Sequence, residues 1–433
     1  MPEKIMQVMP PALRDENILR IKSRIVDMIA PELQKIPSGQ LTRPVVRQYL
    51  EKVFDGLRLG ESISAPVRQQ IVDSALADLV GYGLLELVLN DPEISEIMVN
   101  GPSLTFVERN GELYETDIQF ESSAHLLRLI DRILSPLGRR VDYDNPTVDA
   151  RLPDGSRVNV AIPPVAVDGP VITVRKFRPS RMTVEDLIAM GTITPYMAKF
   201  LEACVVARMN ILISGNTSAG KSTMLNVLST FIPAHERIIT IEDAVELQMI
   251  QRHVVRMETK LPSVDGTGGV TVRDLVRNAM RMRPDRLVIG EVRGGETLDM
   301  LQMMNTGHSG SLTTLHANTP RDAISRLETL ALMAGLDLPM MALRKQISSA
   351  LNLIVHMTRL PDGTRKATQI TEVGGMEGDI VTQTDIYKFV QANVGLDGKV
   401  NGELKATGIR PMFSPRLEQA GYKLGGEYFG MGL

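Results

Sequence analysis

The first part of the chain carries apolar side chains at helical spacing. Between Asp15 and Ile29 the apolar positions recur every three or four residues, which predicts an amphipathic helix, and Pro31 interrupts this pattern. The same spacing predicts further helices over Thr42–Leu59 and Val67–Val80. Apart from a loose tail at its start, the segment 1–70 is expected to form a small helical bundle with a structural or docking role.

The pattern changes over residues 71–178, where short polar and apolar alternations are bounded by turn signals such as Asn110-Gly111. A helix is expected over Ser123–Leu134. The expected strands are Ile97–Val99, Leu104–Glu108, Gly111–Tyr114, Val148–Leu152, Arg157–Ile162 and Val171–Phe177. This segment is therefore predicted to be an α+β domain.

Over residues 185–433 apolar strand-like runs alternate with helical patterns, which is typical of an α/β domain with a parallel sheet. The buried-strand candidates are Ile211–Ile213, Arg237–Ile241 and Leu287–Ile289. We expect a linker at 179–184, where Thr183 and Asp186 form a capping box for the next helix. The tail after about Gly395 is rich in glycine and less regular.

Composition narrows the class of protein. A chain of 433 residues exceeds one hydrophobic core, so two or three domains are expected. A net charge of −3 and 4% aromatic residues favour no direct nucleic-acid partner. The single cysteine, Cys204, excludes an internal disulfide and is interpreted as a core residue. No apolar run approaches the ~20 residues that cross a bilayer, so a cytoplasmic protein is expected, with membrane contact only through partners.

The clearest chemical motif follows the first buried-strand candidate. The sequence GNTSAGKS at Gly215–Ser222 matches the phosphate-loop pattern G-x-x-x-x-G-K-[ST] between a strand and a helix. Small residues let backbone N–H groups converge on the phosphates, and the helix N-terminus adds positive partial charge. Lys221 is expected to reach the β- and γ-phosphates and Ser222 to ligate Mg²⁺. The residues expected to bind the nucleoside triphosphate are Gly215, Asn216, Thr217, Ser218, Ala219, Gly220, Lys221, Ser222 and Thr223.

Carboxylates follow the other two buried-strand candidates. Glu242 and Asp243 are placed to hold Mg²⁺, directly or through water, or to orient the attacking water, although helix capping would also explain Asp243. Glu291 is the expected general base. The acidic residue that usually precedes this glutamate is here Gly290, which shifts Mg²⁺ binding toward Ser222 and Glu242.

Histidine and arginine residues complete the candidate set. His308 and His316 fit no zinc spacing but suit a sensor that hydrogen-bonds the phosphate or its water, although a lone histidine is more often structural. In the α+β segment, Arg151, Arg157 and Arg175 lie on or beside strands. Such arginines are usually solvated, yet beside a triphosphate they commonly neutralise transition-state charge.

These motifs resemble the type II/IV secretion ATPase superfamily, and most closely its Flp/Tad pilus-assembly branch. The elements shared in order are the phosphate loop at 215–222, IITIEDAVEL at 238–247, RMRPDRLVIGEVRGGET at 281–297 and the histidine box TGHSGSLTTLHAN at 306–318. The initial helical bundle and the later stretches TEVGGMEGDIV and ATGIRP also resemble that branch.

The resemblance implies a RecA-like P-loop ATPase domain preceded by a PAS-like α+β domain, assembled as a homo-oligomeric ring, a hexamer, on the cytosolic side of an inner membrane. It implies ATP and Mg²⁺ as cofactors and an inner-membrane platform protein as partner. By this resemblance Glu291 is the catalytic glutamate and Glu242 the acidic-box carboxylate and metal ligand. His308 and His316 form the histidine box. Arg157 and Arg175 match the arginine fingers best, and Arg151 is the next best match.

Three functions remain open besides an ATP-hydrolysing motor for Flp/Tad pilus assembly. One is a type IV secretion traffic ATPase. Another is a nucleotide-gated scaffold that binds ATP without turnover, against which the presence of both Glu242 and Glu291 argues. The weakest is a DNA-acting ATPase, since no basic stripe with interleaved aromatic residues is visible.

Overall fold

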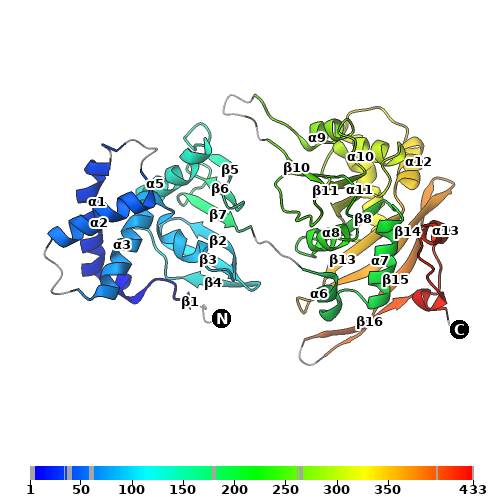
Figure 1. Ribbon diagram of the computed structural model, residues 1–433, viewed down its shortest axis with the longest axis horizontal. Coiled ribbons are helices and arrows are strands. Elements are labelled where there is room, and N and C mark those ends of the chain that lie inside the picture. The colour runs from blue at the N-terminus through cyan, green and yellow to red at the C-terminus, as the bar shows by residue number, and fades with distance from the viewer. Residues whose placement is uncertain are drawn as a thin grey trace. The chain divides into compact units, whose positions relative to one another are not determined.

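The computed structural model describes residues 5–33, 35–36, 41–57, 63–177, 182–260, 262, 267–395 and 398–431. The chain divides into two compact units, Met1–Arg178 and Pro179–Leu433 (Figure 1). Residues 179–181 of the predicted linker at 179–184 lie outside the described residues, and Val184 already belongs to the next helix. The expected capping box of Thr183 and Asp186 is confirmed at the start of α6 (Val184–Ala189).

The first unit contains the predicted helical bundle. Its helices are α1 (Glu16–Leu33), α2 (Arg43–Gly56) and α3 (Ala65–Val80). Their apolar stripes meet in a core that includes Ile29, Leu50 and Ile71. The expectation that Pro31 interrupts the first helix is wrong, because the helix continues to Leu33, whose side chain is buried in the same core. A proline in the last turn removes one backbone donor, a loss that this burial offsets.

A mixed sheet forms the rest of the first unit, in the order β1-β4-β3-β2-β7-β6-β5. Its strands are β1 (Ile5–Met6), β2 (Ile94–Asn100), β3 (Leu104–Arg109), β4 (Glu112–Thr116), β5 (Thr147–Arg151), β6 (Arg157–Ala161) and β7 (Val171–Arg175). The helix α5 (Ser123–Leu134), predicted at these bounds, packs Leu126 and Ile130 against Ile97 and Val174 of the sheet. The loose tail expected at the start is wrong in part, because β1 pairs in parallel with β4.

Short elements complete the first unit. They are η1 (Pro11–Arg14), η3 (Gly83–Leu85), α4 (Glu86–Leu89) and η4 (Ser135–Leu137).

The second unit is built on a sheet in the order β10-β9-β11-β12-β8-β13-β14-β15-β16. From β10 to β13 neighbouring strands are parallel, as predicted. These strands are β8 (Ile211–Gly215), β9 (Ile238–Glu242), β10 (Val254–Glu258), β11 (Arg286–Ile289), β12 (Leu312–His316) and β13 (Leu353–Arg359). Cores form on both faces, because Ile211 and Ile213 of β8 face α7 and α8 while Leu212 faces the opposite helices. The sheet is therefore covered by helices on both sides (Figure 1).

The helices of this unit follow the strands in the chain. Besides α6 they are α7 (Pro195–Val206), α8 (Lys221–Ser229), α9 (Val272–Ala279), α10 (Glu296–Asn305), α11 (Pro320–Leu332), α12 (Met340–Ala350), α13 (Ser414–Gln419) and the short η5 (Gly426–Phe429). Cys204 lies buried in α7, as expected, and burial raises the pKa of its thiol well above the ordinary value.

The strand–helix alternation expected to the end of the chain is wrong after β13. The chain instead returns through antiparallel strands β14 (Arg365–Glu377), β15 (Ile380–Val394) and β16 (Val400–Ala406). Antiparallel neighbours need only a tight turn between them, and Asp362-Gly363 and Gly378-Asp379 supply such turns here. Within the described ranges no helix is long and apolar enough to cross a bilayer.

Candidate functional site

The phosphate loop follows β8, a buried strand in the interior of the second sheet. Its first glycine, Gly215, has φ +151°, and a Cβ there would lie 2.2 Å from the backbone oxygen of Met357 on β13. Gly220 has φ +93°, and the helix α8 begins at the next residue. The glycines are thus required by strand packing and by the turn. Ser218 also adopts a positive φ of 59°, which marks a constrained loop.

The lysine of this loop lies at the centre of a polar cluster. Lys221 is buried, and its Nζ donates to the Asn216 carbonyl at 3.0 Å. The same Nζ lies 3.3 Å from Nδ1 of His316, which ends β12. Burial lowers the pKa of both side chains, and for His316 the charge of Lys221 lowers it further. The imidazole is therefore an uncharged hydrogen-bonding partner near neutral pH.

A carboxylate connects this histidine to an arginine. Glu291, which follows β11, places Oε1 2.9 Å from His316 Nε2. Its Oε2 accepts from Arg293 Nη2 at 2.6 Å and from Arg293 Nε at 3.0 Å. Arg293 Nη1 lies 3.2 Å from Oδ2 of Asp243, the residue that follows β9. The structure thus brings Lys221, His316, Glu291, Arg293 and Asp243 into one connected network at the carboxyl ends of parallel strands.

The acidic-box carboxylate is buried beside this network. Glu242 Oε1 accepts backbone N–H groups from Glu246 at 2.8 Å and Leu247 at 3.0 Å, so this oxygen fixes the loop after β9. Gly290 packs directly on it, because a Cβ at position 290 would lie 2.9 Å from Glu242 Cγ. That contact explains why the residue before Glu291 is glycine rather than an acid.

The residues beside the phosphate loop fit Mg²⁺, because they offer oxygen atoms as ligands. The described part of the chain gathers no group of three or more His, Cys, Asp or Glu side chains suited to a protein-only metal site. Mg²⁺ is usually held by few protein oxygens together with substrate phosphates. The exposed Ser222 hydroxyl at the start of α8 and the carboxylate of Glu242 supply oxygen donors of that kind. Because one Glu242 oxygen already holds its own loop, a contact through water requires less rearrangement than direct coordination.

Two residues next to the phosphate loop escaped the sequence interpretation. Arg365, at the start of β14, donates Nε–H to the Ser218 carbonyl at 2.9 Å, across 147 positions of sequence. His356 on β13 is buried, with Nδ1 2.9 Å from Ser214 Oγ and a further hydrogen bond to the Asn318 backbone. Both residues follow the histidine box in the chain, and neither belongs to a sequence motif that indicates a role in the site. The turn Asp362-Gly363 was the one local signal that would have placed Arg365 on a hairpin.

The other predicted histidine lies elsewhere. His308 precedes β12, whereas His316 ends it, so the strand separates the two. Since β12 runs parallel to β8, His308 is at the amino edge of the sheet and the phosphate loop at the carboxyl edge. The His308 carbonyl accepts from Ser311 Oγ at 2.9 Å. Within this unit His308 therefore does not join the cluster around Lys221.

The predicted arginines form a row on the first unit. Arg151 on β5 is directly opposite Arg157 on β6, which is opposite Arg175 on β7. Cross-strand partners project from the same face, and the neighbouring Val158 and Val174 point into the core on the other face. Arg175 also lies 3.5 Å from Glu96 of β2. The structure thus places the three arginines at neighbouring positions on one face of the sheet.

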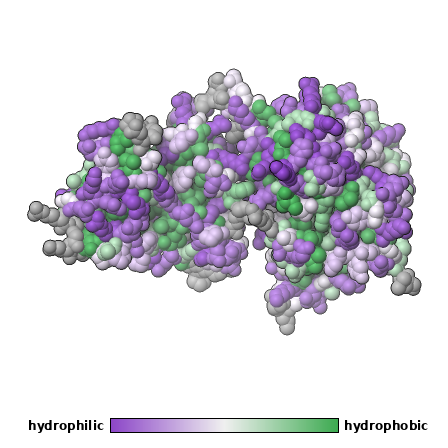
Figure 2. Space-filling model, in the orientation of Figure 1, coloured by the Kyte–Doolittle hydropathy of each residue, from purple (hydrophilic) through white to green (hydrophobic). Residues whose placement is uncertain are grey.

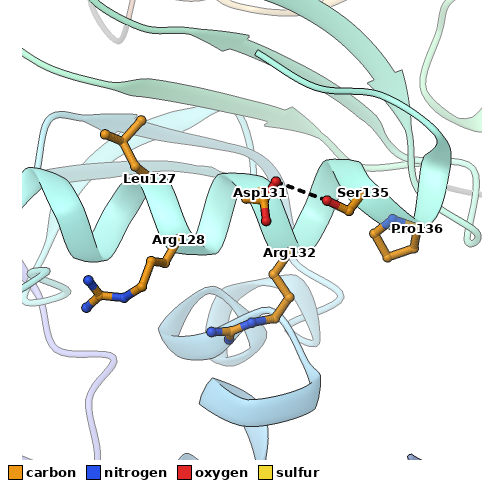
Figure 3. A pocket seen from close by; sticks show the side chains of 6 residues that line it. All are labelled: Leu127, Arg128, Asp131, Arg132, Ser135 and Pro136. Carbon is orange, nitrogen blue, oxygen red and sulfur yellow. Dashed lines mark hydrogen bonds between the residues drawn. The ribbon is translucent and has the colours of Figure 1, made fainter. Parts of the chain in front are cut away.

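A pocket in the first unit lies along α5 (Figure 3). It is lined by Leu127, Arg128, Asp131, Arg132, Ser135 and Pro136. None of the predicted site residues lines it. On the face shown in Figure 2, hydrophilic and apolar residues are interspersed over both units.

The parallel sheet, the phosphate loop after its interior strand β8 and the carboxylates after β9 and β11 define a RecA-like α/β nucleotide-binding unit. A family model described as type II/IV secretion system protein matches residues 78–407, and the chain belongs to that family. The predicted superfamily is thereby confirmed.

Several similar proteins carry names from bacterial conjugation and secretion. A Mycobacterium tuberculosis protein provisionally named a conjugal transfer protein is 36% identical over 313 residues, 71% of this chain and 88% of that one. The conjugal transfer protein TrbB of Rhizobium radiobacter is 31% identical and covers 73% of this chain and 94% of its own. The type IV secretion system protein VirB11 of Brucella abortus is 30% identical over 66% of this chain and 86% of its own. Among solved structures, the pilus retraction motor PilT with bound ADP aligns at 21% identity with a TM-score of 0.48, over 70% of this chain and 82% of its own.

Proposed function

We propose that this protein is a Mg²⁺-dependent ATPase that powers a type IV secretion or conjugal transfer machine. The observation that supports this most directly is the network from Lys221 through His316 to Glu291 beside the phosphate loop. Lys221 would bind the β- and γ-phosphates, Glu291 would take the proton of the attacking water, and His316 would hold Glu291 in place. Mg²⁺, held by Ser222 and the acidic box, would neutralise phosphate charge.

The row of arginines on the first unit supports a second proposed role in ATP hydrolysis. Arg157 and Arg175 are proposed to stabilise the charge that develops on the transferred phosphate, with Arg151 beside them. His308, on the opposite edge of its sheet from the phosphate loop, is proposed to act at another surface, such as a contact between copies in a homo-oligomeric ring, a hexamer. The machine would engage an inner-membrane platform protein from its cytosolic side, without direct nucleic-acid contact.

The relatives named for conjugal transfer and type IV secretion support this reading over the Flp/Tad pilus-assembly motor. One observation keeps the pilus motor as a second candidate. The family match begins at residue 78, so almost all of the helical bundle α1–α3 precedes it, and that bundle resembles the Flp/Tad branch. Deleting the gene and scoring surface filaments against secretion or DNA transfer separates the two functions.

The ATPase proposal is tested by steady-state hydrolysis of MgATP by the purified protein and its Glu291→Gln variant, with nucleotide binding measured for both. The variant should bind ATP and lose about 10²–10⁴-fold in turnover, the usual contribution of a general base. Glu185→Gln, an exposed carboxylate of α6, is the matched control and should keep full activity. If wild type and variant both bind ATP and neither hydrolyses it, a nucleotide-gated scaffold replaces the ATPase.

A further inference from the structure

Arg293 is a charged residue of the site to which the motifs assign no role. All of its donor groups face carboxylates: Nε and Nη2 bond to Glu291 Oε2, and Nη1 pairs with Asp243. These bonds raise the pKa of the guanidinium, so it stays charged at any physiological pH. The positive charge of Arg293 also lowers the pKa of Lys221 and of His316. Arg293 is therefore close enough to the phosphate loop to act on it electrostatically.

The backbone that carries this side chain is anchored on both sides. The buried Val292 donates its N–H to the Thr314 carbonyl of β12 at 3.1 Å. Glu296 Oε1 accepts from the N–H groups of Arg293 at 2.6 Å and Gly294 at 2.8 Å. The side chain itself is 59% exposed. A change in what Arg293 binds therefore requires only rotation about its side-chain bonds.

The charges of the network determine how a bound ATP would change the electrostatics of the site. Lys221 and Arg293 are cations, Glu291 and Asp243 are anions, and His316 is neutral, so the network is balanced. A γ-phosphate bound at Lys221 would add negative charge next to the carboxylate of Glu291, and like charges at short range in a partly buried site repel strongly. A cation between the two would relieve this repulsion. Arg293 is bonded to Glu291 and is the more exposed of the two cations.

We propose that Arg293 is a γ-phosphate-binding residue supplied by this chain itself, which turns from Asp243 to the phosphate while it keeps its bond to Glu291. The planar fork of arginine suits such a bridge, since it binds a carboxylate and a phosphate oxygen simultaneously. The residue would then couple the presence of the γ-phosphate to the orientation of the general base. This inference rests on the proposed ATPase function and adds to it a contact that distinguishes ATP from ADP.

The test compares the affinities of the full-length chain for Mg–AMP-PNP, a non-hydrolysable triphosphate, and Mg–ADP. Arg293→Ala should weaken AMP-PNP binding on the order of tenfold or more, the value of one charge-assisted hydrogen bond, and leave ADP binding within about twofold. Arg293→Lys, which keeps the charge without the fork, should recover part of the AMP-PNP affinity. If the alanine variant does not fold, Arg293→Gln carries the same comparison.

Arg277→Ala is the matched control, because Arg277 is also an exposed arginine of this unit, paired with Asp299 of α10. It should change neither affinity. The proposal is overturned if Arg293→Ala weakens both nucleotides equally, as a purely structural residue would, or weakens neither. An unchanged AMP-PNP affinity with reduced turnover also overturns it, since Arg293 would then act on Glu291 alone. A wild type that binds both nucleotides without hydrolysing ATP contradicts the ATPase proposal and leaves the affinity comparison valid.

Discussion

Arg157 and Arg175 occupy directly opposed positions on β6 and β7, so their side chains leave the same face of the sheet. Like charges directly opposite each other are unfavourable in a sheet. Arg151 on β5 is opposite Arg157 and extends the same row. On the other side, Glu96 of β2 is opposite Arg175. A row of three arginines on one face of a sheet suits an anionic ligand, and Glu96 offsets part of its charge.

Replacing Arg157 or Arg175 by alanine should therefore strongly reduce ATP turnover without unfolding the first unit. We expect ATP hydrolysis to fall by about 10³-fold or more, the loss that removal of an arginine finger causes, with the melting temperature unchanged. Asn159→Ala is the control, since Asn159 lies two residues along β6 on the same face and is exposed. Variants that hydrolyse ATP at the wild-type rate would show that the row serves another purpose.

The buried histidine His356 predicts a pH dependence of stability. Burial lowers its pKa from 6.5 in the folded chain, with opposing contributions from the Asn318 backbone and Asp322. Below about pH 6.5 the unfolded chain therefore binds a proton that the folded chain does not, and stability falls as the pH falls. The melting temperature should drop more steeply between pH 7.5 and 5.5 for the wild type than for His356→Asn.

The same measurement on His235→Asn provides the comparison, because His235 is exposed. Its slope should match that of the wild type. Equal slopes for all three proteins would mean that His356 takes up a proton equally well in the folded and unfolded chains.

A buried ion pair fixes the start of β11. Arg286 is fully buried, with Nε 2.5 Å from Glu236 Oε2 and Nη1 donating to the Val205 carbonyl at 2.8 Å. Removing one partner of such a pair leaves an uncompensated buried charge, so Glu236→Gln should lower the free energy of unfolding by about 3–5 kcal/mol. Chemical denaturation measures it, and the exposed pair in Glu418→Gln should cost less than about 1 kcal/mol. Similar losses for the two variants would contradict the difference in burial.

Local pattern was sufficient for some elements and insufficient for others. The β8–loop–α8 unit and the helix Ser123–Leu134 were predictable because their spacing, caps and glycines lie within a few residues. The bond from Arg365 to the Ser218 carbonyl joins positions 147 apart, and it depends on a strand order that no local pattern contains. The strands β14–β16 were missed because they are partly exposed and mixed in polarity. They therefore lack the apolar runs that identified β8 and β9 in the sequence.

The departure at Gly290 gives a last prediction, because this position usually carries an acid. Restoring the acid with Gly290→Asp should reduce both stability and turnover rather than strengthen Mg²⁺ binding. The new Cβ would lie 2.9 Å from Glu242 Cγ, and Glu242 is buried and held by two backbone N–H groups, so it has little room to move. Overpacking of this kind costs about 1–3 kcal/mol.

Thermal unfolding and the Mg²⁺ dependence of hydrolysis, measured on Gly290→Asp, Gly290→Ala and the wild type, decide this point. Gly375→Ala is the control, since a Cβ at that exposed glycine of β14 meets nothing within 4 Å. The alanine variant isolates the steric effect from the added charge, and we expect it to share the loss. If Gly290→Asp instead lowered the Mg²⁺ concentration needed for half-maximal activity, the glycine would reflect a weakened metal site and not the packing of Glu242.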